Sequence, residues 1–164
     1  MKPWMDRPRE VAFLLNPAFC AAAVGEVAKG YQDEASGPIE LPLLFVAIPL
    51  ALHLETRAAF PRSIATRHNV WLESHQELRV GFTDRCRSIA PYVREAIVFG
   101  GQHGVFSVTT DGRLALSRAS RRSVGRNPDS QDVAATMKAA KFVGRWLASA
   151  GPTNTVFALW GVRP

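Results

Sequence analysis

Residues that could do acid–base, nucleophilic or metal chemistry are few in this 164-residue sequence, and they are widely spaced. The 4 histidines form no HExxH or HxH pair, and only His68 and His75 are spaced to share one helical face. No two carboxylates stand out as a paired acid and base. Ser63 lies in PRSIAT, which lacks the GxSxG turn that exposes a nucleophilic serine. Because an enzyme needs a nucleophile, a base and oxyanion donors at workable spacing, we predict that the protein is not an enzyme.

Cofactor and metal motifs are equally weak. The run GGQHG at 100–104 is rich in glycine, but it has no phosphate-binding lysine and follows a predicted helix instead of preceding one. A helix end with a turn explains its glycines better. Cys20 and Cys86 have no CxxC partner, which argues against a zinc site, a redox motif or a secreted disulfide framework. The sequence therefore predicts no cofactor, no metal and a reducing cytoplasm.

Arginine clusters are the most informative polar feature. The net charge is +6 and the pI is about 10.0, from 20 Lys+Arg against 14 Asp+Glu. Such a balance favours nucleic acid, an anionic surface or an acidic protein, and it is also what an ordinary solvated surface needs. The sharper interpretation is a phosphate-contacting face, with one arginine near a hairpin tip reaching a minor groove. The candidate DNA or partner contacts are Arg57, Arg62, Arg67, Arg94, Arg113, Arg118, Arg121, Arg122 and Arg126.

From the first half of the sequence we predict helices, and we expect residues 1–164 to form a single domain. An arm at 1–15 precedes Asn16-Pro17, which supplies an N-cap and a first-turn proline. The helix that follows should bury Phe19, Val27 and their neighbours, leave Glu26 and Lys29 in water, and close at Gly30 and 32–37. The run Leu41 to Glu55 is apolar on all sides, so we expect a central helix. Pro49 should kink or split it.

The stretch Tyr92 to Leu116 reads as the centre of the fold. A helix resuming at about Asn69 should continue through Thr83 to Ser88 until Pro91 stops it. A short helix, Tyr92 to Gly100, then precedes two alternating strands joined at Asp111-Gly112. Helix followed by hairpin is typical of the recognition helix and wing of a winged-helix domain. We therefore predict an α+β, mainly α-helical, winged-helix-like fold with one β-hairpin wing.

The last third of the chain predicts a basic loop and two further elements. Residues 117–131 are arginine-rich, and Asp129 or Ser130 can cap the next helix. That helix carries a basic stripe opposite its apolar face, formed by Lys138, Lys141 and Arg145. The ending TVFALWG is a short helix or a strand, and we expect it to dock on the core. The most apolar run, 39–54, is interrupted by charged and proline residues and is shorter than the ~20 residues that span a bilayer, so we expect no membrane contact.

Several segments, taken in order, resemble one family. They are the helix NPAFCAAAV, the run LPLLFVAIPLALHLETRAAFP, the passage WLESHQELRVGFTDRCRSIAPYVREAIVFG and the ending FALWGVRP. Their order and spacing are similar to those of the small middle components of bacterial ABC-type three-component systems, which act in conflict with phages. The resemblance covers nearly the whole chain.

The resemblance implies a non-enzymatic, winged-helix-like adaptor beside an SMC/Rad50-like ABC ATPase and an effector protein, with DNA contact made through the complex. It carries over no catalytic residues. It implies structural or interface roles at two motifs, which comprise Thr56, Arg57 and Pro61, and Pro91, Tyr92, Arg94 and Glu95. The alternative is a stand-alone winged-helix DNA-binding regulator. However, the recognition helix offers chiefly Arg94 and Glu95, a poor pair for reading base edges, so the wing looks more like a docking element.

Overall fold

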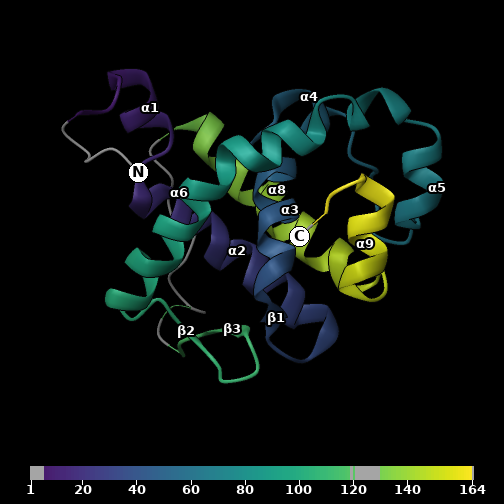
Figure 1. Cartoon of the computed structure of the whole chain (residues 1–164). Coiled ribbons are helices and arrows are strands. Elements are labelled where there is room, and N and C mark those ends of the chain that lie inside the picture. Colours follow the sequence, from purple (N-terminus) through teal and green to yellow (C-terminus); the bar gives the residue numbers. More distant parts are fainter. Residues whose placement is uncertain (1–5, 119, 121–129, 164) are drawn as a thin grey trace.

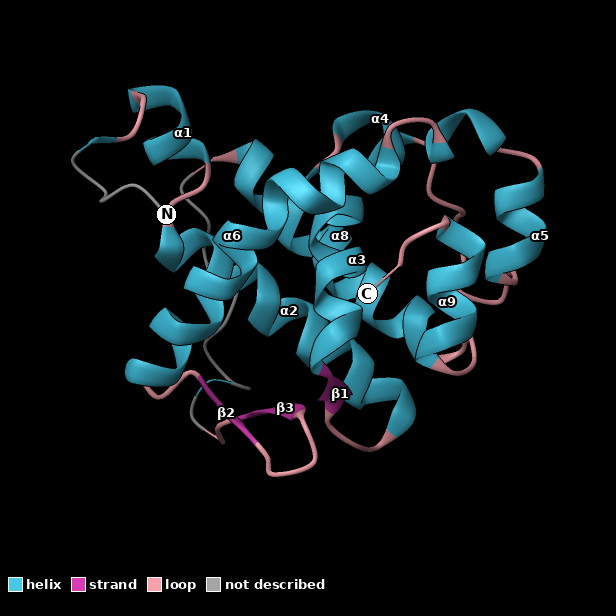
Figure 2. Cartoon of the chain, viewed as in Figure 1, coloured by secondary structure: helices cyan, strands magenta, loops and turns pink. Residues whose placement is uncertain are grey.

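Helices packed around a small sheet make up the structure, a computed structural model that describes residues 6–118, 120 and 130–163 (Figure 1). The helices are α1 (Arg9–Leu14), α2 (Pro17–Ala35), α3 (Leu41–Leu52), α4 (Leu54–Ala58), α5 (His68–Glu73), the 3-10 helix η2 (Gln76–Arg79), α6 (Phe82–Gln102), α8 (Gln131–Ala148) and α9 (Thr153–Trp160). The strands are β1 (Ile39–Glu40), β2 (Phe106–Val108) and β3 (Arg113–Leu116), which lie together at one edge of the helical body (Figure 2). The predicted α+β, mainly α-helical class is confirmed.

Helix α2 begins where the sequence predicts and ends inside the predicted closing segment 32–37, although not at Gly30. The side chain of Asn16 accepts a hydrogen bond from the amide of Ala18 at 2.8 Å, and Pro17 occupies the first turn. The helix passes through Gly30 and ends at Ser36, which has a left-handed φ of 55°. Gly30 was therefore wrongly predicted to close it.

Helix α3 is the central helix, as predicted. Seven of its apolar side chains are at most 1% exposed, namely Leu43, Leu44, Val46, Ala47, Ile48, Leu50 and Ala51. Pro49 lies inside the helix, which ends three residues later at Leu52. His53 then adopts an extended conformation, and its Nδ1 accepts from the amide of Thr56 at 3.4 Å to cap α4. The predicted run is therefore split into two helices, but the split lies at His53 and not at the proline.

Helices α2 and α8 cross at close range. The side chain of Ser130 caps α8 by accepting from the amide of Val133 at 3.2 Å, as predicted. Two residues of the predicted basic stripe face acids of α2, because Lys141 pairs with Asp33 at 3.1 Å and Arg145 with Glu34 at 2.6 Å. The stripe therefore joins two helices.

Glu26 of α2 was wrongly predicted to be solvated. It is 5% exposed, and desolvation by burial raises the pKa of its carboxyl, although Lys29 lies 3.9 Å away and lowers it. The periodicity placed Glu26 on the outer face because it could not show how much of α2 the rest of the fold covers.

Helix α6 contains the largest correction to the predicted elements. The sequence predicted one helix from Asn69 to Pro91, but α5 and η2 are separate, and α6 begins after Gly81, which has a φ of 68°. Pro91 does not stop α6, which runs from Phe82 to Gln102. Buried residues lie on both sides of the proline, at Phe82, Cys86, Val93, Ala96 and Gly100. Packing of this face outweighs the one hydrogen bond that the proline removes.

The predicted hairpin is confirmed, and a third strand accompanies it. The register pairs Phe106 with Leu116 and Val108 with Leu114. The loop ends at Gly112, which has a φ of 74° that favours glycine. β1 pairs antiparallel with the other edge of β3, so the strand order is β1-β3-β2. The winged-helix detail is not confirmed, since the preceding helix is long and the hairpin is held at its far edge.

An aromatic cluster docks α9 on the body, as expected for the apolar ending, and the segment is a helix. Trp160 is 1% exposed and lies 4.3 Å from Phe82, measured between ring centroids. Its indole N–H donates to Nε2 of His68 at 2.7 Å, and His68 stacks 4.0 Å from Trp146. Within the described ranges no helix has the length and apolar character needed to cross a membrane.

Candidate protein interface

Arg57 lies at the start of the candidate interface, where α4 meets α8. Its guanidinium Nη1 donates to Oγ1 of Thr136 at 2.7 Å and to the carbonyl oxygens of Ala51 and Leu52 at 3.3 and 3.5 Å. The carboxylate of Asp132 is 3.8 Å from its Nη2. The Arg57 side chain is only 13% exposed. This arginine therefore braces the end of α3 against α8.

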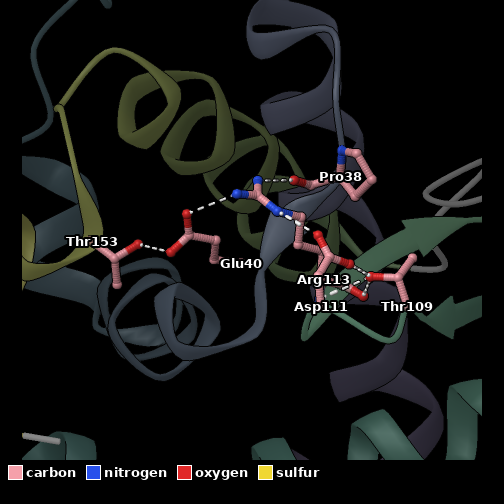
Figure 3. Close-up of polar contacts among 6 residues, drawn as sticks. All are labelled: Pro38, Glu40, Thr109, Asp111, Arg113 and Thr153. Atoms are coloured by element: carbon pink, nitrogen blue, oxygen red, sulfur yellow. Dashed lines mark hydrogen bonds and ion pairs between the residues drawn. The ribbon is translucent and has the colours of Figure 1, made fainter.

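Arg113 is held in a second polar cluster (Figure 3). Its guanidinium contacts the Glu40 carboxylate at 3.2 Å, the Pro38 carbonyl at 3.3 Å and the Asp111 carboxylate at 3.1 Å. The other Glu40 oxygen accepts from the hydroxyl of Thr153 at the start of α9. Arg113 was predicted near the hairpin tip, and the structure places it across β1, β3 and α9 by way of Glu40.

Asp111 completes that cluster at the hairpin loop. The hydroxyl of Thr109 donates to its carboxylate, and this hydrogen bond is the first cause that lowers the pKa of Asp111, followed in part by the charge of Arg113. The backbone amide of Gly112 also donates to the Thr109 carbonyl at 3.0 Å. These hydrogen bonds between residues of the loop hold the hairpin loop in one conformation.

The structure does not bring the other predicted arginines into one face. Arg62 and Arg67 are exposed between α4 and α5, at the opposite end of the molecule from the hairpin, whereas the exposed Arg118 follows β3 (Figure 1). Arg94 is exposed on α6, with its guanidinium carbon 5.7 Å from the Phe45 ring centroid. The remaining three predicted contacts, Arg121, Arg122 and Arg126, lie outside the described residues.

The motif positions implied by the resemblance have structural contacts. Thr56 is 1% exposed, and its Oγ1 lies 2.8 Å from Nδ1 of His53. Glu95 accepts two hydrogen bonds from Arg7, at 2.8 and 2.7 Å, and the Arg7 guanidinium lies 5.8 Å from the Tyr92 ring centroid. The second motif therefore holds the chain just before α1.

An apolar groove lies between α1, α4 and α8, and we call it the leucine groove. Its volume is about 480 Å³. Eight of its eleven lining residues are apolar, and the residues are Val11, Leu14, Leu15, Phe19, Leu52, Leu54, Arg57, Ile89, Asp132, Val133 and Thr136. Leu14 and Leu54 are 71% and 67% exposed although they lie 40 positions apart in the sequence. The fold brings two exposed leucines from different helices into one groove.

Sequence reasoning missed the leucine groove because Leu54 was assigned to a central helix and Leu14 to an arm that precedes the first predicted helix. The break that frees Leu54 from the central face lies at His53, after the end of α3, and not at Pro49, where the sequence predicts a kink or split. Tertiary assembly supplies the rest, because helices α1, α2, α3, α4, α6 and α8 each contribute lining residues.

Two further hollows lie on other faces. One, of about 390 Å³, runs between α5, η2 and α9 and is lined by Asn69, Leu72, Glu73, Gln76, Arg79, Thr155, Ala158 and Leu159. The other, of about 610 Å³, follows the outer face of α6 around Pro91 and includes the half-exposed Val98. In both, polar side chains make up a larger share of the lining residues than in the leucine groove.

The histidines singled out in the sequence are used in packing. His68 is 4% exposed, and burial lowers its pKa from 6.5 to about 4. The ring of His75 stacks on that of Trp71 at 4.6 Å, and its Nδ1 lies 2.8 Å from the Trp71 carbonyl oxygen. In the part of the chain that the structure describes, no group of three His, Cys, Asp or Glu residues could hold a metal ion.

Comparison with known proteins gives a family match over nearly the whole chain. The family described as ABC-three component (ABC-3C) system Middle Component 3 (MC3) matches residues 4–164. The chain is also 30% identical over 158 residues to a "Ribosome biogenesis protein ytm1" of Aspergillus niger, and 29% identical over 154 residues to that of Aspergillus oryzae. These alignments cover 94% and 92% of the chain but only 29% and 28% of the relatives, so it spans less than a third of their length. No solved structure matches it.

Proposed function

The chain belongs to the ABC-three component system Middle Component 3 family, and we propose that it is a non-enzymatic adaptor subunit of a bacterial defence system. In this role it links an SMC/Rad50-like ABC ATPase to an effector protein in the cytoplasm. The observation that carries the proposal is the family match over residues 4–164. Membership of a three-component system implies partner subunits.

The distribution of surface features supports an adaptor. Linking two proteins requires two separate contact surfaces, and the leucine groove and the hollow between α5, η2 and α9 are built from different helices. Exposed large apolar side chains that gather in a groove are typical of protein interaction sites. Lys141 and Arg145 contact α2 directly, and the close crossing of α2 and α8 gives the two surfaces a rigid body between them.

The contacts of the buried polar residues also support a non-catalytic role. Among the partly or fully buried groups that could do chemistry, His68, His53 and Arg57 are each occupied with a structural contact. An active site instead keeps its reactive groups directed at a space that substrate can enter.

Co-expression tests the adaptor directly. The ATPase and effector encoded beside the chain are expressed as a pair, with and without it, and each mixture is analysed by size-exclusion chromatography at micromolar concentration. We expect the two proteins to co-elute only when the chain is present. Elution of the chain by itself, with the ATPase and effector unlinked, would refute the proposal.

A stand-alone DNA-binding regulator is the second candidate. The pI of about 10.0 and the exposed Arg62, Arg67, Arg94 and Arg118 favour it. Its signature is duplex binding that weakens steeply with salt, since each neutralised phosphate adds about one unit to the slope of log affinity against log salt concentration. Absence of binding in low salt removes this candidate and leaves the adaptor standing.

A further inference from the structure

We propose that the leucine groove binds an amphipathic α-helix of a partner subunit, and that this helix carries a lysine or arginine next to its apolar stripe. The inference rests on the proposed adaptor function and adds the chemistry of one partner. Its evidence is independent of the family match, because it comes from the exposure, the backbone and the charges of the groove.

The apolar walls of the groove are incompletely covered. Leu14 and Leu54 are the two most exposed leucines of the described chain, at 71% and 67%, and both line the same 480 Å³ groove. Beneath them lie the partly buried Leu15, Phe19 and Ile89. An occupant with several apolar side chains would remove both leucines from water and extend the apolar core outward.

The backbone of the groove favours a helix as the occupant. Every lining residue except Leu15 belongs to a helix and none belongs to a strand, so the walls of the groove contain no sheet edge. A bound strand needs unpaired N–H and C=O groups along a sheet edge, which these walls do not offer. An amphipathic helix needs only side-chain contacts, made by residues spaced at i, i+3, i+4 and i+7.

The charges of the groove favour a cation on that helix. Arg57 is 13% exposed, and its guanidinium already contacts Thr136, two backbone carbonyls and Asp132. Asp132 is 91% exposed, and its carboxylate is 3.8 Å from Arg57. Glu55, which follows Leu54, is 81% exposed. Two exposed carboxylates beside the leucines complement a lysine or arginine on an incoming helix.

A second copy of the chain does not offer a suitable helix. The other large apolar side chains that are exposed on the described residues are valines, and they are Val70, Val80, Val98 and Val108. Val70 lies on α5, Val80 between η2 and α6, Val98 on α6 and Val108 on β2, so outside the leucine groove no described helix presents an exposed apolar stripe. The groove therefore fits a different protein better than another copy.

Paired surface variants test the groove. Leu14→Glu and Leu54→Glu, singly and together, are compared with the control variants Val80→Glu and Val98→Glu, which alter equally exposed apolar residues elsewhere. Binding of each full-length chain to the ATPase and to the effector is measured separately by calorimetry. We expect the double groove variant to lose at least tenfold in affinity for one subunit, and the controls to lose less than twofold. Circular dichroism shows whether each variant folds.

A charge test and a cross-link identify the occupant. Asp132→Asn with Glu55→Gln should weaken binding severalfold and reduce its dependence on salt, whereas Asp84→Asn, an exposed acid on α6, should not. A photo-crosslinker at position 54 of the otherwise unaltered chain, in the assembled complex, should label a partner segment with an apolar stripe and an adjacent lysine or arginine.

The outcomes separate this inference from the proposed function. If the chain binds a subunit and the leucine variants bind equally well, the groove assignment is overturned and the adaptor survives. Cross-links only to a second copy, or to a partner segment without an apolar stripe, also overturn it. If the unaltered chain binds neither subunit, the adaptor and the groove assignment both fail.

Discussion

Gly30 of α2 and Gly144 of α8 face one another's helices at a distance that admits no side chain. A Cβ atom at Gly30 would lie 2.1 Å from the Lys141 carbonyl oxygen, and one at Gly144 would lie 2.0 Å from the Val27 carbonyl oxygen. Both obstacles are helix backbone, which cannot rotate away as a side chain can. The crossing of α2 and α8 therefore depends on these two glycines.

Gly144→Ala should destabilise the protein strongly. The added methyl carbon would lie 2.0 Å from the Val27 carbonyl oxygen and would force the two helices apart. We therefore expect the free energy of unfolding to fall by about 3 kcal/mol or more. Gly101→Ala is the matched control, because Gly101 is exposed in α6 and its Cβ would meet nothing within 4 Å. Its higher helix propensity should stabilise by up to ~1 kcal/mol. Chemical unfolding measures both, and equal stabilities would contradict the close crossing.

Local patterns in the sequence predicted the elements whose signals are local. Asn16-Pro17 starts α2, the apolar run makes α3 a central helix, and Asp111-Gly112 turns the hairpin. Each depends on residues that are close in the chain. Gly30 was wrongly predicted to end a helix because its role is a contact with Lys141, more than a hundred positions away.

Pairings between distant segments explain what the sequence did not predict. β1 has only two residues, Ile39 and Glu40, and neither shows a strand pattern, so its pairing with β3 was not predicted. Arg57 was predicted as a surface contact, and its link to Thr136, which spans 79 positions, was not predicted. The leucine groove combines six helices. The position of the leucine groove depends on tertiary packing, which the spacing of apolar residues in the sequence does not reveal.

Arg57→Ala should cost about 2–3 kcal/mol of stability. The substitution removes hydrogen bonds from a charged donor that is 13% exposed and leaves the Ala51 and Leu52 carbonyls without this partner. Arg62→Ala should change stability by less than about 0.5 kcal/mol, because Arg62 is exposed. Urea unfolding distinguishes the two. If both variants were equally mild, Arg57 would be an ordinary surface arginine.

Glu40→Ala should loosen the hairpin and the start of α9 together. Its carboxylate contacts Arg113 at 3.2 Å and also accepts from Thr153, so it joins two segments that are otherwise separate (Figure 3). Both partners of the ion pair are more than a third exposed, so solvent screening limits the expected loss to about 1 kcal/mol. Hydrogen exchange of the amides in β3 and at the N-terminus of α9 should then accelerate roughly fivefold.

Glu55→Ala is the control for that experiment. Glu55 is 81% exposed and lies at the opposite end of the molecule, so its removal should leave hydrogen exchange in the hairpin unchanged. If Glu40→Ala accelerated hydrogen exchange in the hairpin but not in α9, the contact between Glu40 and Thr153 would not be what anchors α9.

His68 should make the protein lose stability as the pH falls. Burial lowers its folded-state pKa from 6.5 to about 4, so the neutral ring is favoured in the folded protein. The stabilisation is complete above pH 6.5, where both states are neutral, and is lost progressively as the pH falls toward 4 and the unfolded chain takes up the proton. The shift corresponds to a loss of roughly 3 kcal/mol.

The hydrogen bond between His68 and Trp160 explains how protonation of His68 would affect the structure. Nε2 of His68 accepts the indole N–H at 2.7 Å, and a proton on Nε2 would remove the acceptor that holds α9. His68→Gln should therefore have a shallower fall in unfolding free energy between pH 6.5 and 4 than the unaltered protein. His103→Gln, which changes an exposed histidine, should keep the original slope. If unfolding curves at these pH values gave His68→Gln the same slope as the unaltered protein, the acid sensitivity would have to come from other groups, such as His53, whose pKa burial also lowers, or the carboxylates.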